Sequence, residues 1–186
     1  MEQLAVIALI VVVLALAVFG LWFYLRKRSD ALQEKFGPEY DRVVNEADSR
    51  LRAESELRQR EKRLDDLDIR PLDPDTRRRY QERWDELQQR FVDDPAGAVG
   101  EADRLVIEVM RDRAYPVEDF EQRAADLSVD HPDVVENYRI AHGIAVEHEK
   151  GQADTEDLRQ ALVAYRALVE ALLADAEETS TQTRSE

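Results

Sequence analysis

The sequence predicts an all-α protein with one N-terminal transmembrane helix, a charged stalk helix and a compact bundle of about five helices. Three observations lead to this prediction. The 22 residues from Leu4 to Leu25 contain no charge, whereas 17 of the 30 residues from Glu39 to Asp68 are charged. Between Leu72 and Ala176, apolar residues recur at helical spacing, and no segment shows the strict alternation typical of strands.

The first expected element crosses a membrane. As a helix, Leu4 to Leu25 spans roughly 33 Å, enough for a hydrocarbon core of about 30 Å. Trp22 and Tyr24 suit the headgroup boundary, and the basic anchors Arg26, Lys27 and Arg28 follow directly. The positive-inside rule then places residues 1–3 outside the cell and the C-terminal part in the cytoplasm. A buried helix of a globular core is the less favoured alternative. A cleavable signal peptide is not expected, because the segment has neither a basic leader nor a small-residue cleavage site.

A basic juxtamembrane segment and a stalk helix are expected over 26–71, with a hinge at Gly37-Pro38. Acids precede bases at i,i+4 along Glu39–Asp68, which favours one long solvated helix. Its apolar seam starts at Tyr40, Val44, Ala47 and Leu51, but Leu57 and Leu64 are out of step with it. A permanent coiled coil is therefore a minority interpretation.

The bundle domain is expected over 72–176, followed by a disordered tail over 177–186. Its five helices are expected to start at Asp73-Pro74, Asp94-Pro95, Pro116, Asp130 or His131, and Asp154 or Thr155. Gly151 is expected to end the fourth of them. The cleanest predicted core face is formed by Tyr80, Trp84, Leu87 and Phe91.

Charge and motifs exclude several function classes. Residues 1–28 carry one acid and three bases, so the remaining chain has a formal charge of −17, which disfavours nucleic acid. Ser128, Asp130 and His131 share one turn, too short for a catalytic triad. The other two histidines, His142 and His148, lack helical metal-ligand spacing. We therefore assign no catalytic, cofactor-binding or metal-binding residue.

The most suggestive region surrounds one short predicted helix. Acids, arginines and aromatic residues are dense there, and its candidate interaction residues are Asp119, Arg123, Asp130, His131 and Arg139. Such a density marks either a structural network of paired charges or a recognition surface. We prefer the structural network, because buried charges in small helical domains are generally paired.

Several blocks of the sequence resemble one protein family. These blocks are KFGPEYDR, RFVDDP, YPVEDFEQRAADLSVDHPDVVENYRIAH and TEDLRQALVAYRALVEALL. They are similar to a largely uncharacterised family of small single-pass bacterial membrane proteins, met mainly in actinobacteria. The resemblance implies a cytoplasmic helical domain, and it implies no activity, cofactor or catalytic residue.

Together these features predict a membrane-anchored, non-catalytic interaction or scaffold protein on the cytoplasmic face of the cell membrane. Its expected partners are the lipid bilayer, through Leu4 to Leu25, and another membrane or cytoplasmic protein. The alternative is a small-ligand-binding or enzymatic module that uses the Tyr115 to His142 region. A deep pocket enclosing titratable groups of that region would favour this alternative.

Overall fold

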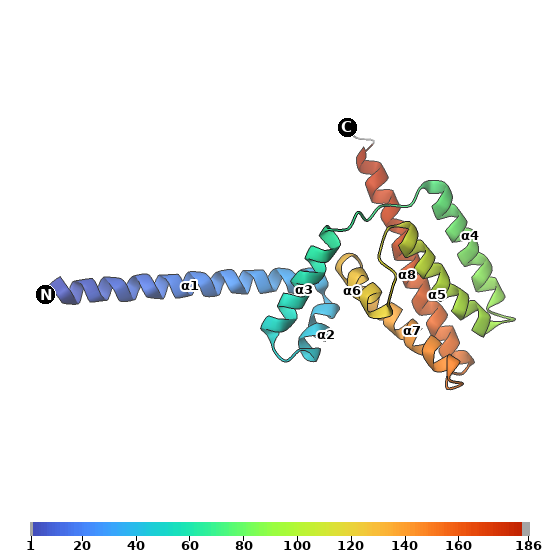
Figure 1. Ribbon diagram of the computed structural model, residues 1–186, viewed down its shortest axis with the longest axis horizontal. Helices are drawn as coiled ribbons and strands as arrows, with labels where there is room; N and C mark the ends of the chain where they lie inside the picture. Colours follow the sequence, from blue (N-terminus) through green and yellow to red (C-terminus); the bar gives the residue numbers. More distant parts are fainter. Residues whose placement is uncertain (1, 184–186) are drawn as a thin grey trace. The chain divides into compact units, whose positions relative to one another are not determined.

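The protein is built from α-helices. The computed structural model describes the backbone of residues 2–183 and the side chains of residues 14, 16–17, 19–20, 22–23 and 26–174. Over residues 2–183 it contains eight α-helices and no strand, which confirms the predicted all-α class (Figure 1). The helices fall into two compact units, residues 1–57 (unit 1) and 58–186 (unit 2).

Helix α1 (Glu2–Phe36) includes the segment expected to cross a membrane. Within the part of the chain whose side chains are described, no helix is long and apolar enough to be a membrane span, and most of Leu4–Leu25 lies outside that part. The large apolar side chains that are described on this segment are between 51% and 66% exposed: Leu14, Leu16, Phe19, Trp22 and Phe23.

Unit 1 continues with α2 (Pro38–Glu46) and the first half of α3 (Arg50–Asp65). The predicted single stalk helix is wrong, because the backbone at Ala47 is extended and separates the two helices. Gly37, with a φ of 47°, precedes Pro38 at the first position of α2, as expected.

The break between α2 and α3 also corrects the predicted apolar seam. Tyr40 and Val43 are buried on α2, while Leu51 is 73% exposed. On α3 a new buried stripe begins, formed by Ala53, Leu57 and Leu64. Leu57 and Leu64 were out of step with the first seam because they belong to a different helix.

Unit 2 contains the last part of α3 and the five expected bundle helices: α4 (Pro74–Arg90), α5 (Pro95–Asp112), α6 (Phe120–Asp130), α7 (Val135–Glu149) and α8 (Thr155–Thr183). Helix α8 packs between α5 and α7, and α4 covers α5 from outside (Figure 1). The core includes Trp84, Leu105, Tyr138, Tyr165 and Leu168, each at most 1% exposed. The last turns of α3 also belong to unit 2, although the sequence predicts that the bundle domain starts at Leu72.

Side-chain caps begin most helices of unit 2 where the sequence predicts them. The Asp73 carboxylate accepts hydrogen bonds from the amides of Asp75 and Thr76, and the Asp94 carboxylate accepts one from Gly97. Asp154 caps α8 in the same way. Gly151, with a φ of 72°, ends α7 as predicted.

Two predicted helix starts are wrong, and α8 runs further than expected. Helix α6 begins after Asp119 instead of at Pro116, because the Asp119 carboxylate caps the Gln122 amide. Helix α7 begins after Val134, which makes no side-chain cap. The backbone of α8 continues to Thr183, past the predicted end at Ala176, and residues 184–186 of the predicted tail lie outside the described residues.

Candidate functional site

Arg123 is the centre of the region that the sequence singles out. Its side chain projects from α6 and is only 7% exposed. Nε donates to the hydroxyl of Tyr138 on α7 at 2.8 Å, and Nη1 donates to the Val117 carbonyl at 3.0 Å. The guanidinium carbon lies 5.9 Å from the centroid of the Phe120 ring. These hydrogen bonds go to a phenol and a carbonyl, whereas the sequence suggested a carboxylate partner.

A second group of polar side chains joins α5, α7 and α8 beside Arg123. The hydroxyl of Tyr165 donates to the Asp103 carboxylate at 2.9 Å, and Nδ1 of His142 lies 3.9 Å from the same oxygen. The His142 ring stacks on Phe120, with centroids 3.8 Å apart. Tyr138 and Tyr165 meet edge to face, with centroids 6.4 Å apart. The aromatic and polar contacts therefore connect four helices of unit 2.

The electrostatics of this group favour a structural role over a catalytic one. Burial acts to raise the pKa of Asp103, but the hydrogen bond from Tyr165 and the nearby His142 and Arg123 side chains outweigh it and hold that pKa below its usual value. Burial raises the pKa of Tyr138 to about 12, and burial with the nearby Asp103 charge also raises the pKa of Tyr165. Both phenols stay protonated at neutral pH, so neither is activated as a base or nucleophile.

The exposed members of the predicted interaction set are acidic. Asp119 is exposed and serves as the N-cap of α6. Asp130, exposed at the end of the same helix, accepts a hydrogen bond from the Tyr115 hydroxyl at 2.6 Å. Both carboxylates therefore have structural partners while remaining accessible to solvent.

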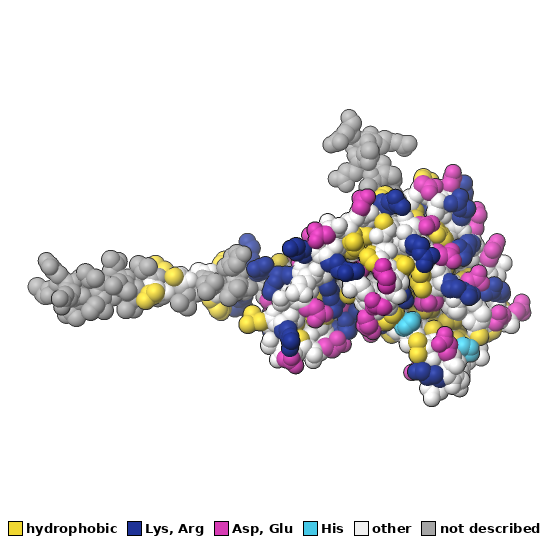
Figure 2. All heavy atoms as spheres, viewed as in Figure 1, with side chains coloured by type: hydrophobic (Ala, Val, Ile, Leu, Met, Phe, Trp, Pro, Cys, Tyr) yellow, Lys and Arg dark blue, Asp and Glu magenta, His cyan; other side chains and the backbone are white. Residues whose placement is uncertain are grey.

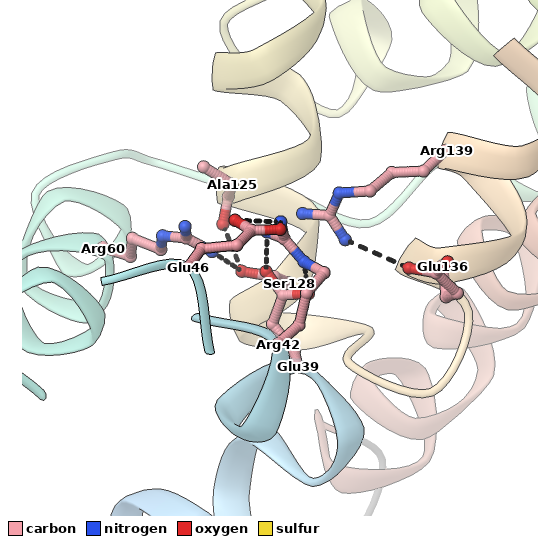
Figure 3. Close-up of polar contacts among 8 residues, drawn as sticks. All are labelled: Glu39, Arg42, Glu46, Arg60, Ala125, Ser128, Glu136 and Arg139. Atoms are coloured by element: carbon pink, nitrogen blue, oxygen red, sulfur yellow. Dashed lines mark hydrogen bonds and ion pairs between the residues drawn. The ribbon is translucent and has the colours of Figure 1, made fainter. Parts of the chain in front are cut away.

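The other two members, His131 and Arg139, lie further along the chain. His131 is buried, and its backbone carbonyl accepts hydrogen bonds from the Val134 and Val135 amides. Arg139 on α7 is half-buried, with Nη1 3.9 Å from the Glu136 carboxylate (Figure 3). The five predicted residues therefore share one region of unit 2.

Asp126 is a buried carboxylate of the region that the sequence singled out, although it is not among the five candidate interaction residues. One oxygen accepts hydrogen bonds from Arg63 Nε at 3.1 Å and Gln122 Nε2 at 2.8 Å, and the other is buried without a hydrogen-bond partner. Burial raises the pKa of this carboxyl despite the attraction of those groups. Two residues on, the Ser128 hydroxyl donates to the Ala125 carbonyl and accepts from Arg60 (Figure 3). These contacts attach the end of α3 to α6.

Two hollows on the surface of unit 2 are lined by other residues. One, of about 330 Å³, lies between α7 and α8 and is called the α7–α8 hollow; its lining includes Ile140 and Val163, which are 44% and 54% exposed. Another lies between α4 and α8, beside Arg77 and Glu170. Neither encloses titratable groups of the 119–139 region. Among the described residues, no group of three or more His, Asp or Glu side chains could hold a metal ion.

Unit 1 contains a polar cluster that sequence reasoning missed. Arg50 Nη2 donates to the Ser29 hydroxyl at 2.7 Å, and Nε donates to the Tyr40 hydroxyl at 2.9 Å and to Glu54 at 3.1 Å. The Glu54 carboxylate also accepts from Ser29 and Tyr40. Burial opposes ionisation of Glu54, but these hydrogen bonds outweigh it and lower its pKa. A negative Glu54 therefore holds the Arg50 guanidinium in place.

The predicted membrane-interface anchors lie on α1 beside this cluster. Trp22 is 51% exposed, and the Arg26 guanidinium carbon lies 5.3 Å from its ring centroid. Lys27 and Arg28 are exposed, while the side chain of Tyr24 lies outside the described residues. Two cationic side chains of unit 1 therefore lie near the same part of α1: Arg26 projects from it, and Arg50 binds Ser29 on it.

No protein-family model, curated protein or solved structure matches this chain.

Proposed function

We propose that this protein is a membrane-anchored, non-catalytic helical interaction protein whose unit 2 lies on the cytoplasmic face. The exposed apolar surface of α1 carries the proposal. Its described large side chains, from Leu14 to Phe23, are all more than half exposed, on a segment with no charge between Leu4 and Leu25. A surface of this kind is unfavourable in water and is typical of contact with a membrane or a partner.

The cationic residues after this segment support an orientation. Arg26, Lys27 and Arg28 are exposed on α1 directly after the uncharged residues. Basic residues at one end of a membrane helix favour the cytoplasmic side for that end. Residues 1–3 are accordingly proposed to face the outside.

The interaction role is supported by how unit 2 uses its polar residues. The buried groups around Arg123 and Asp103 bind one another, and their nearest phenols are protonated. This gives the alternative, an enzyme or ligand-binding module at Tyr115 to His142, less support. Acidic and basic side chains are interspersed over the visible face of unit 2 (Figure 2), while the net charge from Ser29 onward is −17. We therefore favour a protein partner over nucleic acid.

The α7–α8 hollow is the proposed contact surface of unit 2. Ile140 and Val163 expose apolar area there, and Ala164 and Ala167 also line it. Small residues beside exposed branched ones leave room for an apolar side chain of a partner helix. Tethering to the membrane would raise the local concentration of such a partner, so that a modest interface would suffice.

Two experiments test the proposal. We expect the chain to stay in the membrane fraction after alkaline carbonate treatment, and an alkaline phosphatase fused to its C-terminus to be inactive. Release of the chain by carbonate would contradict the proposed membrane anchor. An active phosphatase fusion would contradict the proposed orientation.

Proximity labelling from the C-terminus tests the contact surface. Val163→Glu should remove specific neighbours, because a buried charge disrupts an apolar contact. Val92→Glu is the matched control, because Val92 is 82% exposed in the turn after α4. Identical neighbours for both variants would reject the α7–α8 hollow as the contact surface.

A further inference from the structure

Unit 1 has a hollow of its own where α1 and the start of α3 meet. It measures about 550 Å³, within the range of small-molecule sites. This hollow is here called the unit 1 hollow. It is lined by Trp22, Arg26, Ser29, Asp30, Gln33, Arg50, Leu51 and Glu54.

The cation on one wall of this hollow is fixed in place. Ser29 and Glu54 are buried, at 7% and 8% exposure, and both bind Arg50. The Arg50 side chain nevertheless remains 59% exposed. Arg50 therefore presents charge to the hollow from a position set by the buried hydrogen bonds, which lowers the entropy cost of binding an anion.

The residues of α1 in the hollow follow an order of charge. Trp22, Arg26 and Asp30 are spaced by four residues, so they lie on one face of the helix with a rise of about 6 Å between successive members. Moving away from the uncharged segment, the face presents an aromatic ring, then a cation, then an anion. Arg26 lies over the Trp22 ring, and Asp30 is exposed.

This order complements one kind of lipid headgroup. In a phospholipid with a terminal amine, the acyl esters lie nearest the membrane interior, the phosphate follows, and the ammonium group lies outermost. Arginine binds phosphate strongly, and a carboxylate pairs with ammonium. An anionic headgroup without an amine would leave Asp30 facing no positive group of the lipid.

We propose that the unit 1 hollow binds the headgroup of an aminophospholipid such as phosphatidylethanolamine. The phosphate lies between Arg26 and Arg50, and the ammonium group pairs with Asp30. Trp22 and Leu51, which is 73% exposed, contact the glycerol and upper acyl region. This proposal rests on the proposed membrane anchor, since only an anchored α1 places the hollow at headgroup level.

Quenching of Trp22 by brominated lipids tests the proposal directly. The chain has two tryptophans, and Trp84 is 1% exposed in the core of unit 2, so the lipid-dependent signal reports Trp22. The full-length chain is reconstituted in phosphatidylcholine nanodiscs that contain brominated phosphatidylethanolamine, phosphatidylglycerol or phosphatidylcholine at equal mole fraction. We expect brominated phosphatidylethanolamine to associate about threefold more strongly than the other two lipids, the scale of one exposed ion pair.

Matched variants separate the headgroup site from general attraction to the membrane. Asp30→Asn should abolish the preference for phosphatidylethanolamine over phosphatidylglycerol, while Glu34→Gln should keep it, because Glu34 is exposed on α1 outside the hollow. Arg50→Gln should weaken quenching by both lipids.

Three results would overturn the proposal: equal quenching by all three lipids, a preference for phosphatidylglycerol, or an unchanged preference in Asp30→Asn. In each of these cases the chain is still in the nanodisc, and the membrane anchor stands. A chain that does not co-purify with the nanodiscs overturns the anchor and the headgroup site together.

Discussion

Replacing Arg123 by alanine removes the side chain that joins α6 to α7 and to the segment before α6. Arg123 is 7% exposed, and its guanidinium donates to Tyr138 at 2.8 Å and to Val117 at 3.0 Å. After the substitution, the Val117 carbonyl loses this donor, and the Tyr138 hydroxyl keeps only its own proton to donate. The interaction with the Phe120 ring is lost as well.

The structure sets the size of the effect. A hydrogen bond from a charged donor contributes about 1.5–3 kcal/mol, and Arg123 makes two. Part of this is offset, because the variant no longer has to bury a guanidinium. We therefore expect Arg123→Ala to lower the free energy of unfolding of unit 2 by about 2–4 kcal/mol.

Denaturant unfolding of the full-length chain in nonionic detergent measures this loss. In a Trp22→Phe background, fluorescence reports Trp84 in the core of unit 2. Arg104→Ala is the control, since Arg104 is exposed on α5, and it should change stability by less than about 0.5 kcal/mol. A double-mutant cycle with Tyr138→Phe should give a coupling of about 0.5–3 kcal/mol. Parent-like unfolding of Arg123→Ala, or zero coupling, would refute the structural role of Arg123.

Three further predictions concern the stability of unit 2. They use the same fluorescence assay, except that unfolding of the Trp84→Ala variant is followed by circular dichroism. Trp84→Ala should cost about 3–5 kcal/mol, because the indole is 1% exposed; a small change would mean that Trp84 is not a core residue. Burial raises the folded-state pKa of Asp126 above its unfolded value, so stability falls as the pH rises between those two values. Asp126→Asn should therefore not lower stability at pH 7 and should flatten that pH dependence, whereas a large loss at pH 7 would contradict the raised pKa. Gly151→Ala should cost about 1–2 kcal/mol through its φ of 72° alone, since no atom beyond the neighbouring residues of the chain lies within 4 Å of the added Cβ. Gly143→Ala, within α7 and equally open, should instead stabilise by about 1 kcal/mol, and equal effects of the two glycine substitutions would contradict the assigned backbone conformations.

The sequence predicted those features of the fold that depend on local chemistry. Asp73 and Asp94 cap helices whose first residue is proline, and Gly151 ends one, because capping needs only the residues within one turn. The break between α2 and α3 has one such local signal, Ser49, whose hydroxyl accepts a hydrogen bond from the Arg52 amide at the start of α3. It contains neither glycine nor proline, and its second signal is the shift in the spacing of apolar residues between Tyr40 and Leu57.

The residue types of the candidate site could be predicted, but most of its partners could not. Arg123 and Tyr138 lie 15 residues apart within the region singled out, whereas Asp103 and Tyr165 lie 62 residues apart and meet only through packing of α5 on α8. The one local signal for Asp103 is a charge among the apolar positions of α5, between Val99 and Val106. The predicted start of α6 at Pro116 was wrong because a side-chain cap at Asp119 outweighed the preference of proline for a first turn.

Labelling of single introduced cysteines tests the membrane-anchored arrangement most directly, because the chain has no cysteine of its own. Gln3→Cys and Val92→Cys are expressed separately, and intact cells are treated with a membrane-impermeant maleimide. Our account predicts that position 3 is labelled in intact cells, and that position 92, which is 82% exposed in unit 2, is labelled only after the membrane is permeabilised. Labelling of Val92→Cys in intact cells, or protection of both positions, would contradict a single span with unit 2 in the cytoplasm.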